Sequence, residues 1–471
     1  MFPFLPLIVL IPIPFAISLF AFNERRSFRI ALASSVVVFL LVAYVAYLGL
    51  SSGFGALSFS QGYIPSLGIS LSLQLTQYSV IFLVMSAIVL LSASIVAGGF
   101  VKESGRIYNL LFLLLESSAL GLFLSGSLFL FYVFWALGEA AMFFMIYVSG
   151  GFDRRYAAIK FMVYSIVASL SLLVGLMVIY ANVPTHTFDL VSIISQAASI
   201  PASAQFVAML LLAFAFLIKI PAFPFHGWLP DACTEAPAPS SMVLAGVMPA
   251  FAAYGLLLMF TLLPESLAYA NYFAVLFGFS ALYCAIVAIR QSNLKRLMAY
   301  AGAMGMGIAS LGLASMNAFG AAGALYLLLS RGIIISLMFL VAGALDESFG
   351  IIALERIKGV MKSFPALSYS FMFGVFAFVG MPLTSGFIGY LLVFSGAFSA
   401  YGVLGIVPIA AIALLGAYLF YVLEKSFLSV SAAVEPNQNP RKSVYLAMGF
   451  LIAATLLFGV MPSLLLSSFA V

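Results

Sequence analysis

Residues 213–231 read AFAFLIKIPAFPFHGWLPD, an apolar helix that carries one lysine, Lys219, just before a cluster of prolines. Pro221 and Pro224 cannot donate a backbone hydrogen bond, so this stretch predicts a helix that breaks after Lys219. An ionised amine in the hydrocarbon interior costs about 2.5–3.5 kcal/mol on insertion scales, so a chain that keeps one there has a partner or a use for it. A buried cation at a broken helix therefore indicates an ion path across a membrane.

The composition also places the chain in a membrane. Of its 471 residues, 65% are hydrophobic and only 7% are charged, whereas soluble domains carry roughly 25% charged residues. The net charge of +5 comes from short loops between apolar stretches rather than from one basic face, so no nucleic acid is expected as a partner. The two cysteines, Cys233 and Cys284, lie far apart, and we expect no disulfide framework, no metal site and no cofactor.

Apolar stretches of about 20 residues, the length that crosses a bilayer, predict an all-α polytopic membrane protein with about fourteen transmembrane helices. The first stretch is too long for a signal-peptide core and lacks a basic leader, so it is expected to be a span. Residues 51–77 alternate polar and apolar side chains, which predicts a short external hairpin. The predicted spans are 2–22, 28–50, 77–100, 108–125, 127–149, 158–181, 205–229, 238–262, 267–288, 295–315, 318–344, 366–399, 403–427 and 443–468.

Two of these spans should be discontinuous. The seventh contains Pro221 and Pro224, and the twelfth contains GMPLTSG at 380–386. The two broken helices stand five helices apart, and because five is odd, tandem five-helix units would have inverted topology. We expect inverted repeats of helices 4–8 and 9–13. The expected organisation is N-terminal helices at 1–106, the two repeats at 107–262 and 263–428, and a final helix at 429–471.

The basic residues orient the predicted bundle. Apart from Lys219, Arg331 and Lys425, every Lys and Arg lies in a loop that follows an odd-numbered span. By the positive-inside rule, these loops are expected in the cytoplasm and both termini outside. The basic residues of the odd-numbered loops are Arg25, Arg26, Arg29, Lys102, Arg106, Arg154, Arg155, Lys160, Arg290, Lys295, Arg296, Arg356, Lys358, Lys362, Arg441 and Lys442.

Several motifs then carry a family resemblance: FYVFW at 131–135, KIPAFPFHGWLPDA at 219–232, EAPAPSS at 235–241, LKRLMAY at 294–300 and PLTSGFIG at 382–389. Together they resemble the antiporter-like subunits, fourteen-helix type, of complex I, of Mrp-type cation/proton antiporters, and of membrane-bound hydrogenases and related archaeal respiratory complexes. The resemblance implies a cell-membrane subunit without a redox centre of its own. It would move protons, or sodium, with energy from a hydrophilic redox arm, beside homologous antiporter-like subunits, small membrane subunits and lipids.

In that family a helix 5 glutamate pairs with a helix 7 lysine. Here Ala136 stands at the glutamate position, and the acid appears at Glu139. Three residues are nearly one helical turn, so Glu139 keeps a similar face about 4.5 Å along the axis, and it can still pair with Lys219. Burial disfavours the charged amine and a carboxylate favours it, so separating the two drives a proton off. The pair could equally be a static ion pair that fixes helix packing.

Beyond this pair, the resemblance implies that titratable residues have been lost. Ala250 stands where related subunits carry the helix 8 lysine, and Gly305 where a helix 10 histidine is common. Arg331 and Ile335 replace a histidine and a lysine of helix 11, and Tyr390 stands where a lysine or glutamate ends the path. An arginine cannot release its proton at biological pH, so Arg331 is expected to be a fixed counter-charge or an electrostatic barrier.

Two further polar residues of the apolar stretches, Glu116 and His226, each allow two interpretations. Glu116 is either part of a carboxylate pathway to a neighbouring subunit or a hydrogen-bonded structural carboxyl. His226 has the intrinsic pKa of a proton relay, but it could also be a satisfied residue of the broken helix. Asp231 and Glu235 are expected to cap helix ends.

Two functions stay open at this stage. In the first, the chain takes part in proton or sodium translocation through a half-path made of Glu139, Lys219 and His226. In the second, it is a structural antiporter-like subunit whose own proton path is interrupted. A third, an independent enzyme or secondary transporter, has less support because the sequence shows no cofactor cluster, nucleophile–base set or phosphate loop.

Overall fold

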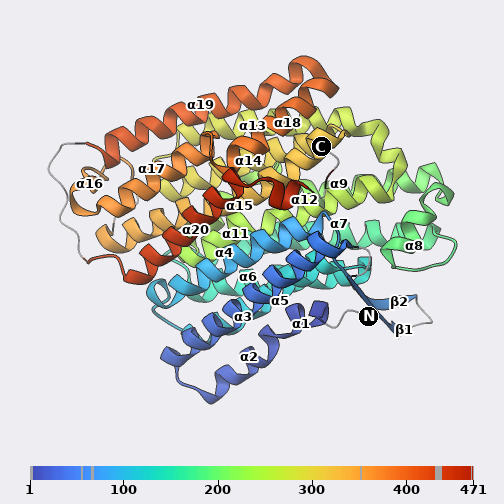
Figure 1. Ribbon diagram of the computed structural model, residues 1–471, viewed down its shortest axis with the longest axis horizontal. Helices are drawn as coiled ribbons and strands as arrows, with labels where there is room; N and C mark the ends of the chain where they lie inside the picture. Colours follow the sequence, from blue (N-terminus) through green and yellow to red (C-terminus); the bar gives the residue numbers. More distant parts are fainter. Residues whose placement is uncertain are drawn as a thin grey trace.

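The computed structural model describes residues 4–54, 57–64, 68–350, 353–429, 438–467 and 469. It shows helices that run side by side along the long axis of the molecule (Figure 1). Within the described residues, thirteen helical segments are long and apolar enough to cross a membrane. The outermost residues of the predicted first and last spans, 2–3 and 468, and residues 65–67 of the predicted hairpin lie outside this part of the chain.

The first half of the chain contains α1 (Phe4–Leu10), α2 (Pro12–Ser18), α3 (Glu24–Ser52), α4 (Ser79–Phe100), α5 (Gly105–Leu124), α6 (Leu128–Ser149), α7 (Arg154–Asn182), α8 (Leu190–Ser195), α9 (Ala202–Lys219), α10 (Trp228–Glu235), α11 (Ala238–Gly246) and α12 (Met248–Leu262). The second half contains α13 (Ala270–Ile289), α14 (Leu294–Ala314), α15 (Ala318–Phe349), α16 (Val360–Ser363), α17 (Pro365–Val379), α18 (Ser385–Tyr401), α19 (Val407–Val422), α20 (Lys442–Val460) and α21 (Ser463–Leu466). A two-stranded sheet of β1 (Ser58–Ile64) and β2 (Ile69–Gln74) lies between α3 and α4.

The thirteen candidate spans differ from the predicted fourteen around the twelfth and thirteenth. α17 has only 15 residues, while the apolar stretch Ser385–Phe427 has 43. A short 3-10 segment at Gly402–Ile406 divides this stretch into α18 and α19. The break predicted in the twelfth span is confirmed, because α17 ends at Val379 and α18 begins at Ser385. Gly380 adopts φ +86° directly after α17, a conformation that favours glycine.

The break predicted after Lys219 is confirmed as well. α9 ends at Lys219 and α10 begins at Trp228. The helix cannot continue through Pro221 and Pro224, which have no N–H to donate. Part of the lost backbone bonding is restored by a side chain, since the Trp228 indole N–H donates to the carbonyl of Ile218 at 2.8 Å.

A third break was not predicted. The span expected at 238–262 is divided into α11 and α12 at Val247, which has φ −108° and ψ −49°. Pro249 lies within the first two positions of α12, where proline is tolerated because the first N–H groups of a helix have no intrahelical partner. α11 therefore ends inside the bundle, with its last carbonyls free to accept from other helices.

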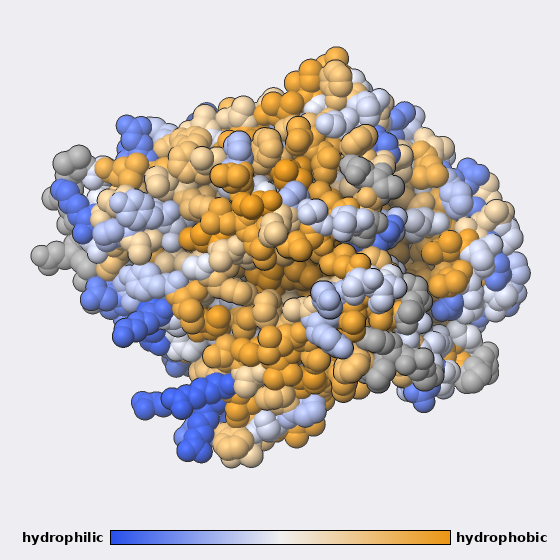
Figure 2. All heavy atoms as spheres, viewed as in Figure 1, coloured by the Kyte–Doolittle hydropathy of each residue, from blue (hydrophilic) through white to orange (hydrophobic). Residues whose placement is uncertain are grey.

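The centre of the bundle is formed by α14 and α15, whose membrane-length apolar stretches are completely buried inside the protein. α15 packs against α4, α11, α14, α17, α18 and α20. The outer helices expose large apolar side chains such as Leu40, Leu170 and Val275, as a surface in contact with lipid requires. Figure 2 shows apolar surface across the middle of one face, with hydrophilic residues gathered towards its two ends.

The two ends of the bundle carry different features. The predicted hairpin is confirmed, because β1 and β2 pair antiparallel with Ser58 opposite Gln74. α1 packs against both strands and Phe469 contacts Tyr78, so both ends of the described chain lie near the hairpin. Lys102, in the loop between α4 and α5, lines one cavity together with Arg154 and Lys295, which lie in the first turns of α7 and α14. We call this end of the bundle the basic end. The inverted-repeat relation of the two halves stays a prediction.

Candidate functional site

The structure brings Glu139 and Lys219 together inside the bundle. Lys219 is the last residue of α9 and Glu139 lies in the middle of α6. The ammonium Nζ is 2.7 Å from carboxylate Oε1, and the two side chains are only 5% and 6% exposed. A charge-assisted contact of this length inside a low-dielectric region is strong, and loss of either partner would leave the other charge uncompensated.

Two serines of α7 complete the pair, and the sequence interpretation missed them. Ser165 accepts from Lys219 Nζ at 2.6 Å, and Ser169 donates to Glu139 Oε2 at 2.5 Å. The Trp135 indole N–H donates in turn to the Ser169 hydroxyl at 3.0 Å. Ser165 and Ser169 are four residues apart and so share one face of the helix. That spacing of serines in an apolar helix is the signal that could have identified them.

His226 lies within the break between α9 and α10, against the second half of the chain. Its ring packs between Phe223, Tyr283 of α13 and Tyr300 of α14, with centroid separations of 6.1, 5.0 and 6.0 Å. Nδ1 is buried and has no hydrogen-bond partner in the described part of the chain. No hydrogen bond or ion pair between described residues joins His226 to Lys219.

Asp231 does not cap a helix, which corrects the sequence expectation. It is the fourth residue of α10, whose N-cap position is Gly227. Its carboxylate instead pairs with Lys160 of α7 at 2.6 Å and with Arg296 of α14 at 2.8 Å. These two ion pairs therefore connect α10 to α7 and to α14.

Glu235 ends α10 and binds the loop that precedes α7. Its Oε2 accepts from the backbone N–H of Asp153 at 2.9 Å. Burial is the main cause that raises the pKa of the Glu235 carboxyl above its ordinary value. The bond to Asp153 acts in the opposite direction, because it favours the ionised carboxylate.

Glu116 stands apart from the Glu139–Lys219 pair. It is 1% exposed on α5, and the Ser34 hydroxyl of α3 donates to it at 3.3 Å. No basic side chain among the described residues forms an ion pair with it. Two turns earlier along the same pair of helices, Asn109 donates to the Ser27 hydroxyl at 2.9 Å. A polar seam thus runs between α3 and α5.

Arg331 occupies the interior of the second half. It is 4% exposed on α15; its Nε donates to the carbonyl of Gly302 at 2.7 Å and its Nη2 to that of Ala245 at 2.9 Å. Nη1 is buried without a hydrogen-bond partner among the described residues. Ala245 lies in the last turn of α11, and the free carbonyls of a helix C-terminus carry partial negative charge that stabilises a cation.

Comparison with known proteins gives the family. Residues 125–416 match the family model described as NADH:quinone oxidoreductase/Mrp antiporter, TM. NADH-quinone oxidoreductase subunit M of Rickettsia prowazekii is 31% identical over 99% of this chain and 96% of its own length. This chain belongs to the antiporter-like membrane subunits.

Further matches to antiporter-like subunits cover nearly the whole chain. F(420)H(2) dehydrogenase subunit M of Methanosarcina mazei is 30% identical over 98% of this chain and 96% of its own length. A chain of respiratory complex I from Thermus thermophilus superimposes with a TM-score of 0.90 at 28% identity, covering 98% of this chain and 97% of that one. The expected fold and family are thereby confirmed.

Arg331 gives a steric reason for one unusual residue of this antiporter-like subunit. A Cβ atom placed on Gly305 would lie 3.0 Å from Cδ of Arg331, so a larger side chain at 305 needs the space that the arginine fills. Ala250, Ile335 and Tyr390 are buried, with exposures of 1%, 0% and 6%. The positions where the family resemblance leads one to expect relay groups thus hold packed residues that do not titrate near neutral pH.

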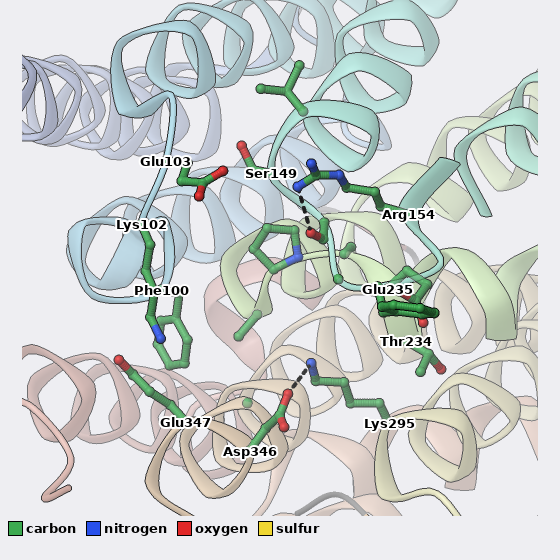
Figure 3. Close-up of a pocket in the computed structure, with 18 of the residues that line it drawn as sticks. Phe100, Lys102, Glu103, Ser149, Arg154, Thr234, Glu235, Lys295, Asp346 and Glu347 are labelled. Atoms are coloured by element: carbon green, nitrogen blue, oxygen red, sulfur yellow. Dashed lines mark hydrogen bonds and ion pairs between the residues drawn. The ribbon is translucent and has the colours of Figure 1, made fainter. Parts of the chain in front are cut away.

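A charged cavity of about 740 Å³ opens at the basic end of this antiporter-like subunit. Figure 3 shows Lys295 paired with Asp346, and Arg154 bonded to a backbone carbonyl, on its wall. At about 30 Å³ per molecule, the cavity has room for roughly two dozen waters. Its floor includes Pro237 and Ala238, at the start of the buried helix α11.

Proposed function

We propose that this antiporter-like subunit takes part in proton, or sodium, translocation within a redox-driven multisubunit membrane complex, with Glu139 and Lys219 as its proton-active pair. The observation that carries this proposal is the buried 2.7 Å contact at the end of a broken helix. A buried lysine and glutamate exchange a proton readily when their separation changes, because each charge is stabilised mainly by the other. The break after Lys219 supplies the point at which that separation can change.

The surroundings of the pair support an entrance from the basic end. Basic loops mark the cytoplasmic side by the positive-inside rule, so the charged cavity and the loops around it would face the cytoplasm and both termini the outside. His226 would be the relay group within the break. Glu116, which is buried and forms no ion pair with a described basic residue, would belong to a lateral proton path along the α3–α5 seam.

The partners follow from the relatives, which are named as subunits of an NADH-quinone oxidoreductase and an F(420)H(2) dehydrogenase. By that likeness, this chain would assemble with other membrane subunits and with a hydrophilic arm that carries the redox centres. In this assembly residues 107–262 and 263–428 would act as two five-helix repeats, flanked by 1–106 and 429–471. Identification of copurifying subunits by mass spectrometry tests this assignment, and a chain that purifies alone would contradict it.

Arg331 favours a second candidate function, a structural subunit with an interrupted path. Its guanidinium cannot give up a proton at biological pH, and the packed residues around it leave no titratable group in the positions of the expected relay. In this view the Glu139–Lys219 pair fixes helix packing and the ion crosses elsewhere in the complex.

Redox-driven ion uptake by membrane vesicles distinguishes the two candidates. Lys219→Ala should reduce the initial rate at least about tenfold, which corresponds to only about 1.4 kcal/mol on the barrier. Lys425→Ala is the matched control, since Lys425 is an exposed lysine bonded to Tyr421 on the surface. Native gel electrophoresis of both variants reports assembly. Unchanged uptake by a fully assembled Lys219→Ala complex would favour the structural role.

A further inference from the structure

The ammonium of Lys219 faces two aromatic rings as well as Glu139. Its Nζ lies 4.5 Å from the ring centroid of Phe161 and 5.2 Å from that of Trp228. The two rings meet edge to face with their centroids 5.4 Å apart, and both are buried. The negative face of an aromatic ring attracts a cation within about 6 Å, and tryptophan does so most strongly.

We infer that Phe161 and Trp228 form an aromatic cradle that holds the Lys219 ammonium whenever Glu139 is not its counter-charge. The inference rests on the proposed function, because an unpaired Lys219 arises only if the pair opens or Glu139 takes up a proton. The two aromatic residues are positioning residues: they stabilise the charge and leave the proton transfer to Glu139 and Lys219.

The need for such a cradle follows from what surrounds Lys219. No described acidic side chain other than Glu139 lies within ion-pair distance of its Nζ. Once Glu139 is neutral, its carbonyl oxygen and Ser165 remain as uncharged acceptors, and the ring faces add the electrostatic attraction that the lost carboxylate no longer supplies. A desolvated cation–π contact stabilises a charge about as strongly as a hydrogen bond to a charged group does. The cradle therefore retains a cation that would otherwise be expelled.

Trp228 is held in place for this task by the broken helix itself. Its indole N–H donates to the carbonyl of Ile218, the neighbour of Lys219, so the ring keeps its place beside the lysine. Trp228 is also the first residue of α10, in which Asp231 pairs with Lys160 and Arg296. A shift of the ammonium onto the ring is thus transmitted to α10 and, through Arg296, to α14 in the second half of the chain.

Fluorinated tryptophans test the cradle without changing the shape of the ring. Each fluorine withdraws electron density from the ring face and weakens its attraction for a cation, while the indole N–H is kept. Trp228 would be replaced by mono-, di- and trifluorotryptophan in the intact complex, and the thermal unfolding midpoint measured. We expect the midpoint to fall with each added fluorine in the natural background and to stay level in Lys219→Met, which removes the cation and keeps a similar length.

The chain provides its own reference, because it has only two tryptophans. The same series at Trp135, which is bonded to Ser169 and has no described ammonium over its ring, reports the effect of fluorine on a buried indole as such. If the unfolding midpoint falls by the same amount per fluorine at Trp228 with and without Lys219, the inference is overturned. If Lys219→Met does not assemble, Glu139→Gln serves instead. The counter-charge is then gone and the rings carry a larger share of the stabilisation of the cation, so the midpoint should fall more with each added fluorine. An unchanged fall per fluorine would also overturn the inference.

Unfolding needs no ion transport, so failure of the cradle and failure of the proposed function can be told apart. Loss of uptake in Lys219→Ala together with equal fluorine slopes would leave the proposed function standing and remove the cradle. A stepwise decrease of uptake across the Trp228 series is the expected companion result. Constant uptake across that series, together with a midpoint that falls with fluorine only when Lys219 is present, would leave the cradle standing as a stabilising contact and count against the proposed function of the pair.

Discussion

The Glu139–Lys219 pair gives the sharpest stability prediction. Glu139→Gln, Lys219→Met and the double variant remove one charge, the other charge, or both. Both side chains are at most 6% exposed, and each is also bonded to a serine of α7, so neither charge can reach water without moving a helix. The cost of a single substitution is therefore the cost of leaving one buried charge alone.

The magnitudes follow from this geometry. Removing one partner of a buried pair costs about 3–5 kcal/mol, whereas replacing both by uncharged residues of similar volume is often close to neutral. The cradle described above stabilises an unpaired Lys219, so Glu139→Gln should fall at the lower end of that range. The double variant should be more stable than the sum of the single variants predicts, by about 3 kcal/mol or more.

The assay is chemical denaturation of the purified, membrane-reconstituted protein, with helix content and tryptophan fluorescence followed in parallel. The natural chain and all three variants are measured in the same lipid. A double variant that loses as much stability as the two single variants added together would refute the reasoning. It would mean that the two charges are solvated independently, and the pair would then lose its claim to act as one proton-active unit.

Two further predictions concern neighbouring groups. Ser169→Ala removes the donor to Glu139 and should lower stability by about 1.5–3 kcal/mol, the value of a hydrogen bond to a charged group. Ser195→Ala is the surface control, since Ser195 is exposed at the end of α8 and its hydroxyl donates to the backbone carbonyl of Ser192. Equal losses in the two variants would contradict a role at the pair. Gly305→His should lower the free energy of unfolding by about 1–3 kcal/mol, because the new side chain overpacks against Arg331. The loss should be smaller in an Arg331→His background, and the unfolding midpoints of the single and double variants measure the difference. A loss that is independent of residue 331 would contradict the steric explanation.

The sequence predicted the parts of the fold that obey local rules. Apolar length gave the spans, and proline and glycine gave the breaks after Lys219 and Val379, because a missing N–H or a left-handed residue ends a helix regardless of its neighbours. The break at Val247 was missed although Pro249, in the middle of the expected span 238–262, is the same kind of break signal as Pro221 and Pro224. Whether the helix continues there depends on neighbours that accept or supply hydrogen bonds.

The candidate site was predictable to a similar extent. The pairing of Glu139 with Lys219 was expected from the family resemblance, and helix periodicity explained how the acid could move from position 136 to Glu139 and keep a similar face. The four-residue spacing of Ser165 and Ser169 shows that they share one face of α7, but which helices that face meets depends on how α7 is rotated against α6 and α9. Asp231 was misread for the same reason, since its partners Lys160 and Arg296 lie on helices distant in sequence.

The contact between Arg331 and the end of α11 has a mechanical consequence. An interruption in a membrane helix ordinarily works as a hinge, because few backbone bonds resist bending there. Here the Arg331 side chain of α15 donates hydrogen bonds to the carbonyl of Ala245, next to this interruption, and to the carbonyl of Gly302 in α14. Bending at that joint would leave a buried guanidinium without its acceptors, so the joint between α11 and α12 resists flexing, and motion is left to the joint between α9 and α10 that carries Lys219.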